Sequence, residues 1–184
     1  AGADLSGKIV AIGAGSTNSR SKRWGTANFA SLIDRLQSEL GVQIILVGAP
    51  SETDVAAELM ALTTALPVDL TGKTRVAEAA AILSVVDLLV SNDMGLAHLA
   101  PAVGTQTAVI FGPTNPVTTR PYSQNAVVIR KDVECSPCML RDCPIDHRCM
   151  TGVTVESVFE VSRNLLYPPT LDDYREPENA CGVH

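Results

Sequence analysis

The segment 91–98, Ser-Asn-Asp-Met-Gly-Leu-Ala-His, gathers several groups that can bind an anion. It follows an apolar, strand-like run and precedes an apolar, helix-like run, so it forms a turn where a strand enters a helix. The first N–H groups of such a helix have no intrahelical partner and can donate to a phosphate, which Gly95 lets approach the backbone. Asp93 and His98 add a carboxylate and an imidazole nearby. The alternative is that Asn92 or Asp93 only caps the helix.

A second polar segment, residues 13–24, follows the first predicted strand and is rich in glycine and hydroxyl side chains. Its N–H and O–H groups can surround a phosphate, and Lys22 can supply a positive charge. The segment is not a P-loop, because it lacks the Gly-Lys-Ser/Thr ending, and Gly13 and Gly15 form only a partial Gly-x-Gly pattern. The alternative is a solvated basic loop. We expect Trp24 to anchor this loop on the core rather than to stack on a base.

Glu52 follows the second predicted strand and lies at the start of a helix. An acid at this position is favoured by the helix dipole alone, but a carboxylate at a strand end can also bind the hydroxyls of a ribose. Two further polar turns, 70–74 and 111–116, also follow predicted strands. Because a parallel sheet brings the carboxyl ends of its strands to one edge, we expect these turns to lie along that edge with segments 13–24 and 91–98.

Cysteines cluster in the segment 135–149, here called the cysteine loop. The spacing of four thiols and one imidazole allows a tetrahedral structural zinc site, although the second Cys-x-x-Cys pair of many zinc sites is absent. Free thiols and disulfides are the alternatives. A catalytic cysteine is not expected, since the sequence places no base beside one. The candidate zinc ligands are Cys135, Cys138, Cys143, Cys149 and His147.

Strand-like and helix-like apolar runs alternate along the chain, which indicates βαβ units, a parallel sheet and a Rossmann-like α/β fold. We expect residues 1–166 to form one domain that includes the cysteine loop, and residues 167–184 to form a polar, proline-rich tail on its surface. The predicted strands are 8–13, 42–48, 68–70, 87–91, 106–111 and 126–130, and the predicted helices are 29–40, 52–65, 74–85, 96–103 and 154–166.

Composition excludes several classes of protein. The chain has 184 residues, 46% of them hydrophobic, and a net charge of −6, whereas a nucleic-acid-binding domain needs a basic face. No run approaches the roughly 20 apolar residues of a membrane-spanning helix. The N-terminus lacks the basic start and apolar core of a signal peptide, so we expect a cytoplasmic protein. Since the chain begins almost at a strand, we also expect it to be one domain of a longer protein.

Taken together, these segments resemble the ADP-heptose:lipopolysaccharide heptosyltransferases, glycosyltransferase family 9. The similarity runs from residue 13 to residue 150. The turn containing Asp93, Gly95, Leu96 and His98 is a specific motif of that family, and its order among the other turns adds to the resemblance. The motifs are Lys22-Arg23-Trp24 followed by Phe29, Val47-Gly48 with Glu52, and segments 69–74, 91–98, 111–116 and 147–150.

The resemblance implies the GT-B architecture, in which two Rossmann-like domains enclose the active site. The C-terminal domain binds the sugar-nucleotide donor, and the N-terminal domain binds the lipopolysaccharide core acceptor and supplies the catalytic carboxylate. This chain would therefore be the C-terminal half. It would bind ADP-heptose, assist an inverting transfer that needs no catalytic metal or cofactor, and be inactive alone.

The resemblance also implies roles for individual residues. Lys22 would neutralise the donor diphosphate with help from Thr17, Glu52 would hold the ribose, and Asp93 would face the heptose. Asn18 and Met94 depart from the Thr and the Ser or Thr of many family members, but the backbone N–H of Met94 is unaffected by that change. The other expected donor-binding residues are Gly95, Leu96 and His98.

Other functions stay open on the sequence alone. One alternative is a GT-B enzyme with a UDP or GDP donor, and another is a non-catalytic nucleotide-binding module. A third is a zinc-dependent interaction domain built around the cysteine loop. For the heptosyltransferase, the expected partners are ADP-heptose and the lipopolysaccharide acceptor, with no nucleic acid. Peripheral contact with the cytoplasmic face of the inner membrane is also expected.

Overall fold

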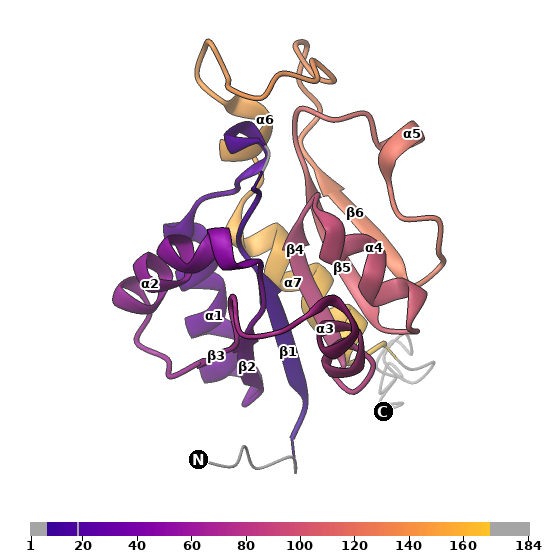
Figure 1. The fold of residues 1–184 in the computed structure, drawn as a ribbon. Helices are drawn as coiled ribbons and strands as arrows, with labels where there is room; N and C mark the ends of the chain where they lie inside the picture. The colour runs from indigo at the N-terminus through magenta and orange to yellow at the C-terminus, as the bar shows by residue number, and fades with distance from the viewer. Residues whose placement is uncertain (1–6, 18, 170–184) are drawn as a thin grey trace, which may run out of the picture.

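A computed structural model, which describes residues 7–17 and 19–169, contains one six-stranded sheet in that part of the chain (Figure 1). Every pair of neighbouring strands is parallel, and their order is β3-β2-β1-β4-β5-β6. This is the strand order of the Rossmann fold, and it reverses direction between β1 and β4. The predicted Rossmann-like α/β fold is therefore confirmed. The strands are β1 (Ile9–Gly13), β2 (Gln43–Leu46), β3 (Val68–Asp69), β4 (Leu88–Asn92), β5 (Gln106–Phe111) and β6 (Ala126–Arg130).

Helices cover both faces of the sheet because side chains alternate between the faces along each strand. In β1, Val10 and Ile12 join the core beneath α1, α2 and α7, whereas Ala11 packs toward α3 and α4. The largest buried side chains include Phe29 of α1 and Phe159 of α7. The helices are α1 (Thr26–Leu40), α2 (Thr53–Leu62), α3 (Val76–Leu83), α4 (Gly95–Ala102), α5 (Pro116–Thr119), α6 (Arg148–Thr151) and α7 (Val155–Leu166), with 3-10 turns η1 (Arg20–Lys22) and η2 (Pro50–Glu52).

The predicted strands match the structure within two residues at each end, but some helices differ. Helix α1 begins at Thr26, three residues earlier than predicted, because its first turn carries no large apolar side chain. Helix α2 ends at Leu62 rather than at residue 65. The N–H groups of Thr64 and Ala65 donate instead to Asp34 of α1, at 2.9 and 3.1 Å. Helices α5 and α6 were not predicted, since four residues are too few to show a helical period.

Trp24 fixes the loop between β1 and α1 to the core, as expected. Its ring is buried, its Nε1 donates to the carbonyl of Val153 at 2.7 Å, and it meets Phe29 edge-on with 5.0 Å between the ring centroids. The tail prediction from residue 170 onward lies outside the described residues, as do residues 1–6, Asn18 and Cys181. No helix within 7–17 and 19–169 is long and apolar enough to span a membrane.

Candidate functional site

A pocket of about 430 Å³ opens at the carboxyl ends of β1, β2 and β4, where the strand order reverses and open α/β sheets bind their ligands. It contains eight of the nine donor-binding residues predicted from the sequence, and the ninth, Asn18, is outside the described residues. The parallel sheet thus brings three distant turns to one place. The pocket is lined by Ser16, Thr17, Ser19, Lys22, Ala49, Glu52, Asp93, Met94, Gly95, Leu96 and His98.

Lys22 and Asp93 form an ion pair within this pocket. Lys22 Nζ lies 2.8 Å from Asp93 Oδ2, and the two side chains are 26% and 5% exposed. The Thr114 hydroxyl donates to the same carboxylate oxygen at 2.7 Å. Lys22 is therefore held against a buried carboxylate rather than freely solvated. Its ammonium has three N–H donors, so those not used by Asp93 can bind an anion in the pocket.

Asn92 joins the two loops that carry this ion pair. Its side chain is fully buried, its Oδ1 accepts from the N–H of Trp24 at 3.1 Å, and its Nδ2 donates to the carbonyls of Ala14 and Gly15 at 2.8 and 3.1 Å. The alternative that Asn92 or Asp93 caps α4 is wrong. Met94 is the N-cap residue of α4 and makes no side-chain capping bond.

The carboxylate of Glu52 is buried beside the pocket, with the residue only 2% exposed. It accepts from the N–H of Ala49 at 2.9 Å and from the Thr17 hydroxyl at 3.1 Å. Two glycines make room for it: a Cβ at Gly15 would overlap the carboxyl group, and one at Gly48 would lie 2.9 Å from Oε2. An ionised carboxylate has about four acceptor positions, so Glu52 retains capacity for the hydroxyls of a ligand.

The N-terminus of α4 forms another wall of the pocket. The helix begins at Gly95, where an added Cβ would meet no atom within 4 Å, so the backbone here faces open space. Its first N–H groups have no carbonyl partner within the helix, and the helix dipole favours an anion there. A second hollow of about 570 Å³, mostly apolar, shares Gly95, Leu96 and His98 with the pocket. It extends along Leu99 of α4 and Val76 of α3.

The predicted zinc ligands are not assembled into a metal site. Within residues 7–17 and 19–169, no group of three or more His, Cys, Asp or Glu side chains is placed to hold a metal ion. All four cysteines of the cysteine loop are free thiols. His147 Nε2 donates to the carbonyl of Ser21, and Cys149 is buried against Gly112. Burial raises the pKa of the Cys149 thiol, and the neighbouring cysteines raise it further.

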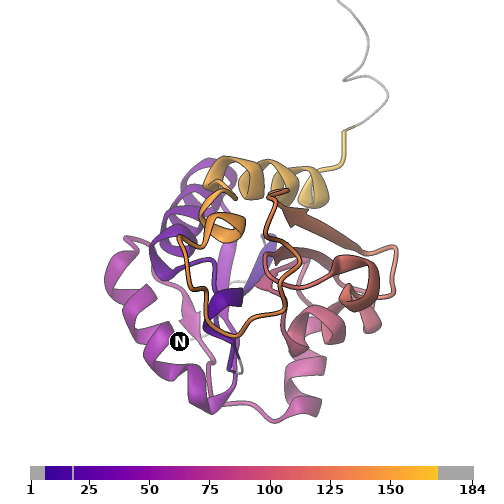
Figure 2. The ribbon, with the colours of Figure 1, turned by 90° about the horizontal axis from the view of Figure 1, so that it is seen from above.

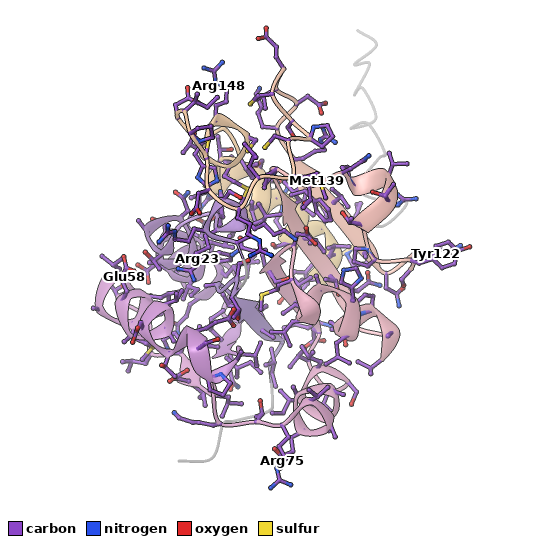
Figure 3. The ribbon with its side chains drawn as sticks, turned by 45° about the horizontal axis from the view of Figure 1, so that its top comes forward. Arg23, Glu58, Arg75, Tyr122, Met139 and Arg148 are labelled. Atoms are coloured by element: carbon purple, nitrogen blue, oxygen red, sulfur yellow. The ribbon has the colours of Figure 1, made fainter. Side chains whose placement is uncertain are left out.

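Sequence reasoning missed several residues that build the pocket. Ser16 and Ser19 lie in the segment predicted to bind phosphate, but they were not singled out. Arg23, labelled in Figure 3, donates to the carbonyl of Ser16 at 3.2 Å and so closes this loop on itself. Thr114 lies in the predicted turn 111–116, and its position in that turn is the one signal that pointed to it. For Asn92 the sequence indicates only a helix-capping role.

Comparison with known proteins identifies the family of this chain. The family model of glycosyltransferase family 9 (heptosyltransferase) matches residues 1–148. Lipooligosaccharide heptosyltransferase 2 of Campylobacter jejuni is 30% identical over 165 residues, which cover 86% of this chain and 51% of that protein. The structure of E. coli ADP-heptose lps heptosyltransferase II has a TM-score of 0.76 and 26% identity, and the match covers 87% of this chain and 46% of that one.

The fold is also shared with E. coli heptosyltransferase WaaC with ADP, at a TM-score of 0.65 and 23% identity, over 89% of this chain and 46% of that one. The chain spans about half the length of the first curated relatives that it matches, 51% and 52%. The chain belongs to glycosyltransferase family 9, the heptosyltransferases.

Proposed function

We propose that this chain binds the ADP-heptose donor of a heptosyltransferase that transfers heptose, with inversion, to the core of lipopolysaccharide. The observation that carries the proposal is the convergence of a cation, a buried carboxylate and a helix N-terminus in one pocket of a family 9 chain. The E. coli relative at 26% identity is itself named an ADP-heptose lps heptosyltransferase.

The polar pocket suits the diphosphate and ribose of such a donor. Lys22 and the first N–H groups of α4 would bind the phosphate oxygens, since both supply positive potential to the same pocket,. Thr17 lines the same pocket and adds a hydroxyl to these phosphate-binding groups. Glu52 would accept from the ribose hydroxyls with the positions left free by Ala49 and Thr17.

The adjoining apolar hollow suits a base. It is continuous with the pocket through Gly95, Leu96 and His98, and aliphatic side chains of α3 and α4 line it. A flat purine ring can pack against such side chains while the ribose stays near Glu52. Ligand pockets commonly combine an apolar lining with a few polar groups that orient the ligand.

The chemistry is an inverting displacement at the anomeric carbon. The acceptor oxygen forms its bond to that carbon as the bond to ADP breaks, and a base takes the acceptor's proton. Lys22 and the helix dipole of α4 would stabilise the negative charge that develops on ADP. Asp93 would face the heptose. This route needs no metal or cofactor.

We assign residues 1–166 to the donor-binding domain and place the acceptor site and the catalytic base in a second Rossmann-like domain, as in the GT-B architecture. The chain's span of about half its relatives' length supports this division. The enzyme would work in the cytoplasm, at the inner membrane that carries its acceptor.

Calorimetry with ADP, UDP and GDP tests the proposed donor. ADP should bind most tightly, and a preference for UDP or GDP would point to another GT-B transferase. Mixed with ADP-heptose and acceptor, the 184 residues alone should transfer no heptose, because the base must lie within hydrogen-bond reach of the acceptor hydroxyl. Joining them to the acceptor-binding half of a relative should restore transfer. Robust transfer without that half would make Asp93 or His98 the base.

A further inference from the structure

The cysteine loop, residues 135–149, passes over the carboxyl edge of the sheet (Figure 2). On one side of the pocket it contacts η1, the turn that ends at Lys22. The N–H of Ser21 donates to the carbonyl of Arg141 at 3.0 Å, and the Ser21 hydroxyl donates to the carbonyl of Leu140. Ser21 is only 3% exposed, so these bonds are shielded from water.

The imidazole of His147 completes this contact. Its Nε2 lies 2.5 Å from the carbonyl oxygen of Ser21, and because a carbonyl can only accept, Nε2 must carry the proton,. Every backbone and side-chain polar group of Ser21 is thus bonded to the cysteine loop. Ser21 precedes Lys22 directly, so the loop fixes the backbone from which the Lys22 side chain extends.

The same loop also contacts the turn that follows β5. The N–H groups of residues 138 and 139 donate to the carbonyl of Pro113 at 3.0 and 2.8 Å, and the Ser136 hydroxyl donates to the carbonyl of Gly112 at 2.6 Å. Thr114, which follows directly, donates to the carboxylate that pairs with Lys22. Figure 3 shows Met139 on this stretch of the loop, above the ends of the strands.

We propose that the cysteine loop is a positioning element of the donor site, which holds Lys22 and the Thr114–Asp93 pair together and so sets the affinity for a nucleoside diphosphate. A lysine side chain has many rotamers, and a binding geometry is kept only when its support is itself held in place. The loop supplies this support from both sides of the ion pair. The inference rests on the proposed function, because it takes Lys22 as the cation that binds the diphosphate.

Two variants each remove a hydroxyl that bonds the cysteine loop to the rest of the domain, at residues that do not themselves line the pocket. Ser21→Ala loses the hydroxyl bonded to Leu140, and Ser136→Ala loses the one bonded to Gly112. Ser21→Ala also removes the 2.9 Å bond between this hydroxyl and that of Ser19, which does line the pocket. Each should raise the Kd for ADP by about three- to tenfold, as expected for the loss of one hydrogen bond. The Kd for adenosine, followed by NMR titration, should change less than about twofold, since adenosine carries no phosphate for Lys22 to bind.

Two controls match these changes. Ser162→Ala removes a fully buried serine hydroxyl that donates to a carbonyl of α7 at 2.7 Å, far from the pocket. Ile145→Ala shortens a side chain of the cysteine loop that is 59% exposed. Both should leave the Kd for ADP unchanged. In a Lys22→Ala background, Ser21→Ala should have no further effect, because residues that act through one another are not additive.

Unchanged ADP affinity in Ser21→Ala and Ser136→Ala, with weakened ADP binding in Lys22→Ala, would overturn the inference and leave the proposed function intact. An equal loss of ADP and adenosine affinity would also overturn it, since the loop would then only stabilise the fold. Unchanged ADP affinity in Lys22→Ala itself would instead remove the proposed role of Lys22, and the inference with it.

Discussion

Replacing Lys22 with alanine removes the cation of the pocket and leaves its carboxylate partner in place. Lys22 Nζ lies 2.8 Å from Asp93 Oδ2, and that carboxylate is only 5% exposed. In the variant, Asp93 keeps its hydrogen bond from Thr114 but has no cation beside it. A diphosphate that enters the pocket therefore loses a charged donor and meets an unneutralised acid. Both effects weaken binding.

The magnitude follows from the type of contact that is lost. A hydrogen bond to a charged group contributes about 1.5–3 kcal/mol. The Lys22 side chain is 26% exposed, so solvent screens it only in part. At about 1.4 kcal/mol for each tenfold change, the Kd for ADP should rise by roughly ten- to a hundredfold.

Calorimetric titration with ADP measures this change, and thermal unfolding checks that the variant is folded. The matched control is Lys8→Ala, which removes a lysine from another Lys–Asp pair, 2.7 Å from Asp87, at the amino end of β1. Lys22→Arg retains the charge and should recover most of the affinity. Equal ADP affinity in the Lys22→Ala and Lys8→Ala proteins would refute the role assigned to Lys22.

Three further outcomes are expected. Gly95→Val should leave the melting temperature of the protein unchanged, because a Cβ at this position meets no atom within 4 Å. It should weaken ADP binding by on the order of tenfold, since the methyl groups of valine occupy the space of the phosphate. Tight ADP binding by this variant would show that the N-terminus of α4 is not part of the site. Thiol labelling mapped by mass spectrometry should modify exposed Cys135 rapidly and Cys149 only on unfolding, because burial shields that thiol and raises its pKa; one equivalent of zinc in the purified protein would contradict the free thiols. Burial of Asp34 opposes its ionisation, but hydrogen bonds from residues 63–65 outweigh this and lower its pKa below the ordinary 3.8, so Asp34→Asn should cost about 1 kcal/mol at pH 7. The stabilisation by Asp34 is present above the pKa of its carboxyl group in the unfolded state and is lost as the pH falls through the pKa in the folded state. The free energies of unfolding of Asp34→Asn and the parent protein should therefore converge below about pH 4, and a difference that does not shrink there would contradict this role.

The alternation of apolar runs was sufficient to predict the class of fold and most of its elements. The periodicity of apolar residues in a strand or a helix is a local property, so it can be recognised in a single sequence. The gathering of polar turns at one edge also followed from the sequence, because parallel strands place their carboxyl ends together. For this reason the sequence predicts that Lys22, Glu52 and Gly95 lie at the same edge of the sheet.

The end of a helix is harder to predict from the sequence when a tertiary contact determines it. Helix α2 ends at Leu62 because the next N–H groups bond to Asp34, on a different helix. The short helices α5 and α6 lie in loops, where the path of the chain depends on its neighbours rather than on a repeating pattern.

The internal supports of the site were determined by the tertiary structure alone. Asn92 bonds to Trp24 across 68 positions, and His147 bonds to Ser21 across 126. Such pairs depend on how the whole chain folds, and no local spacing encodes them. The cysteines illustrate the same limit, since their spacing allowed a zinc site, whereas the path of the cysteine loop directs His147 to Ser21 instead. The sequence by itself determined which residues could bind a nucleotide, and the tertiary structure decided which residues hold them in position.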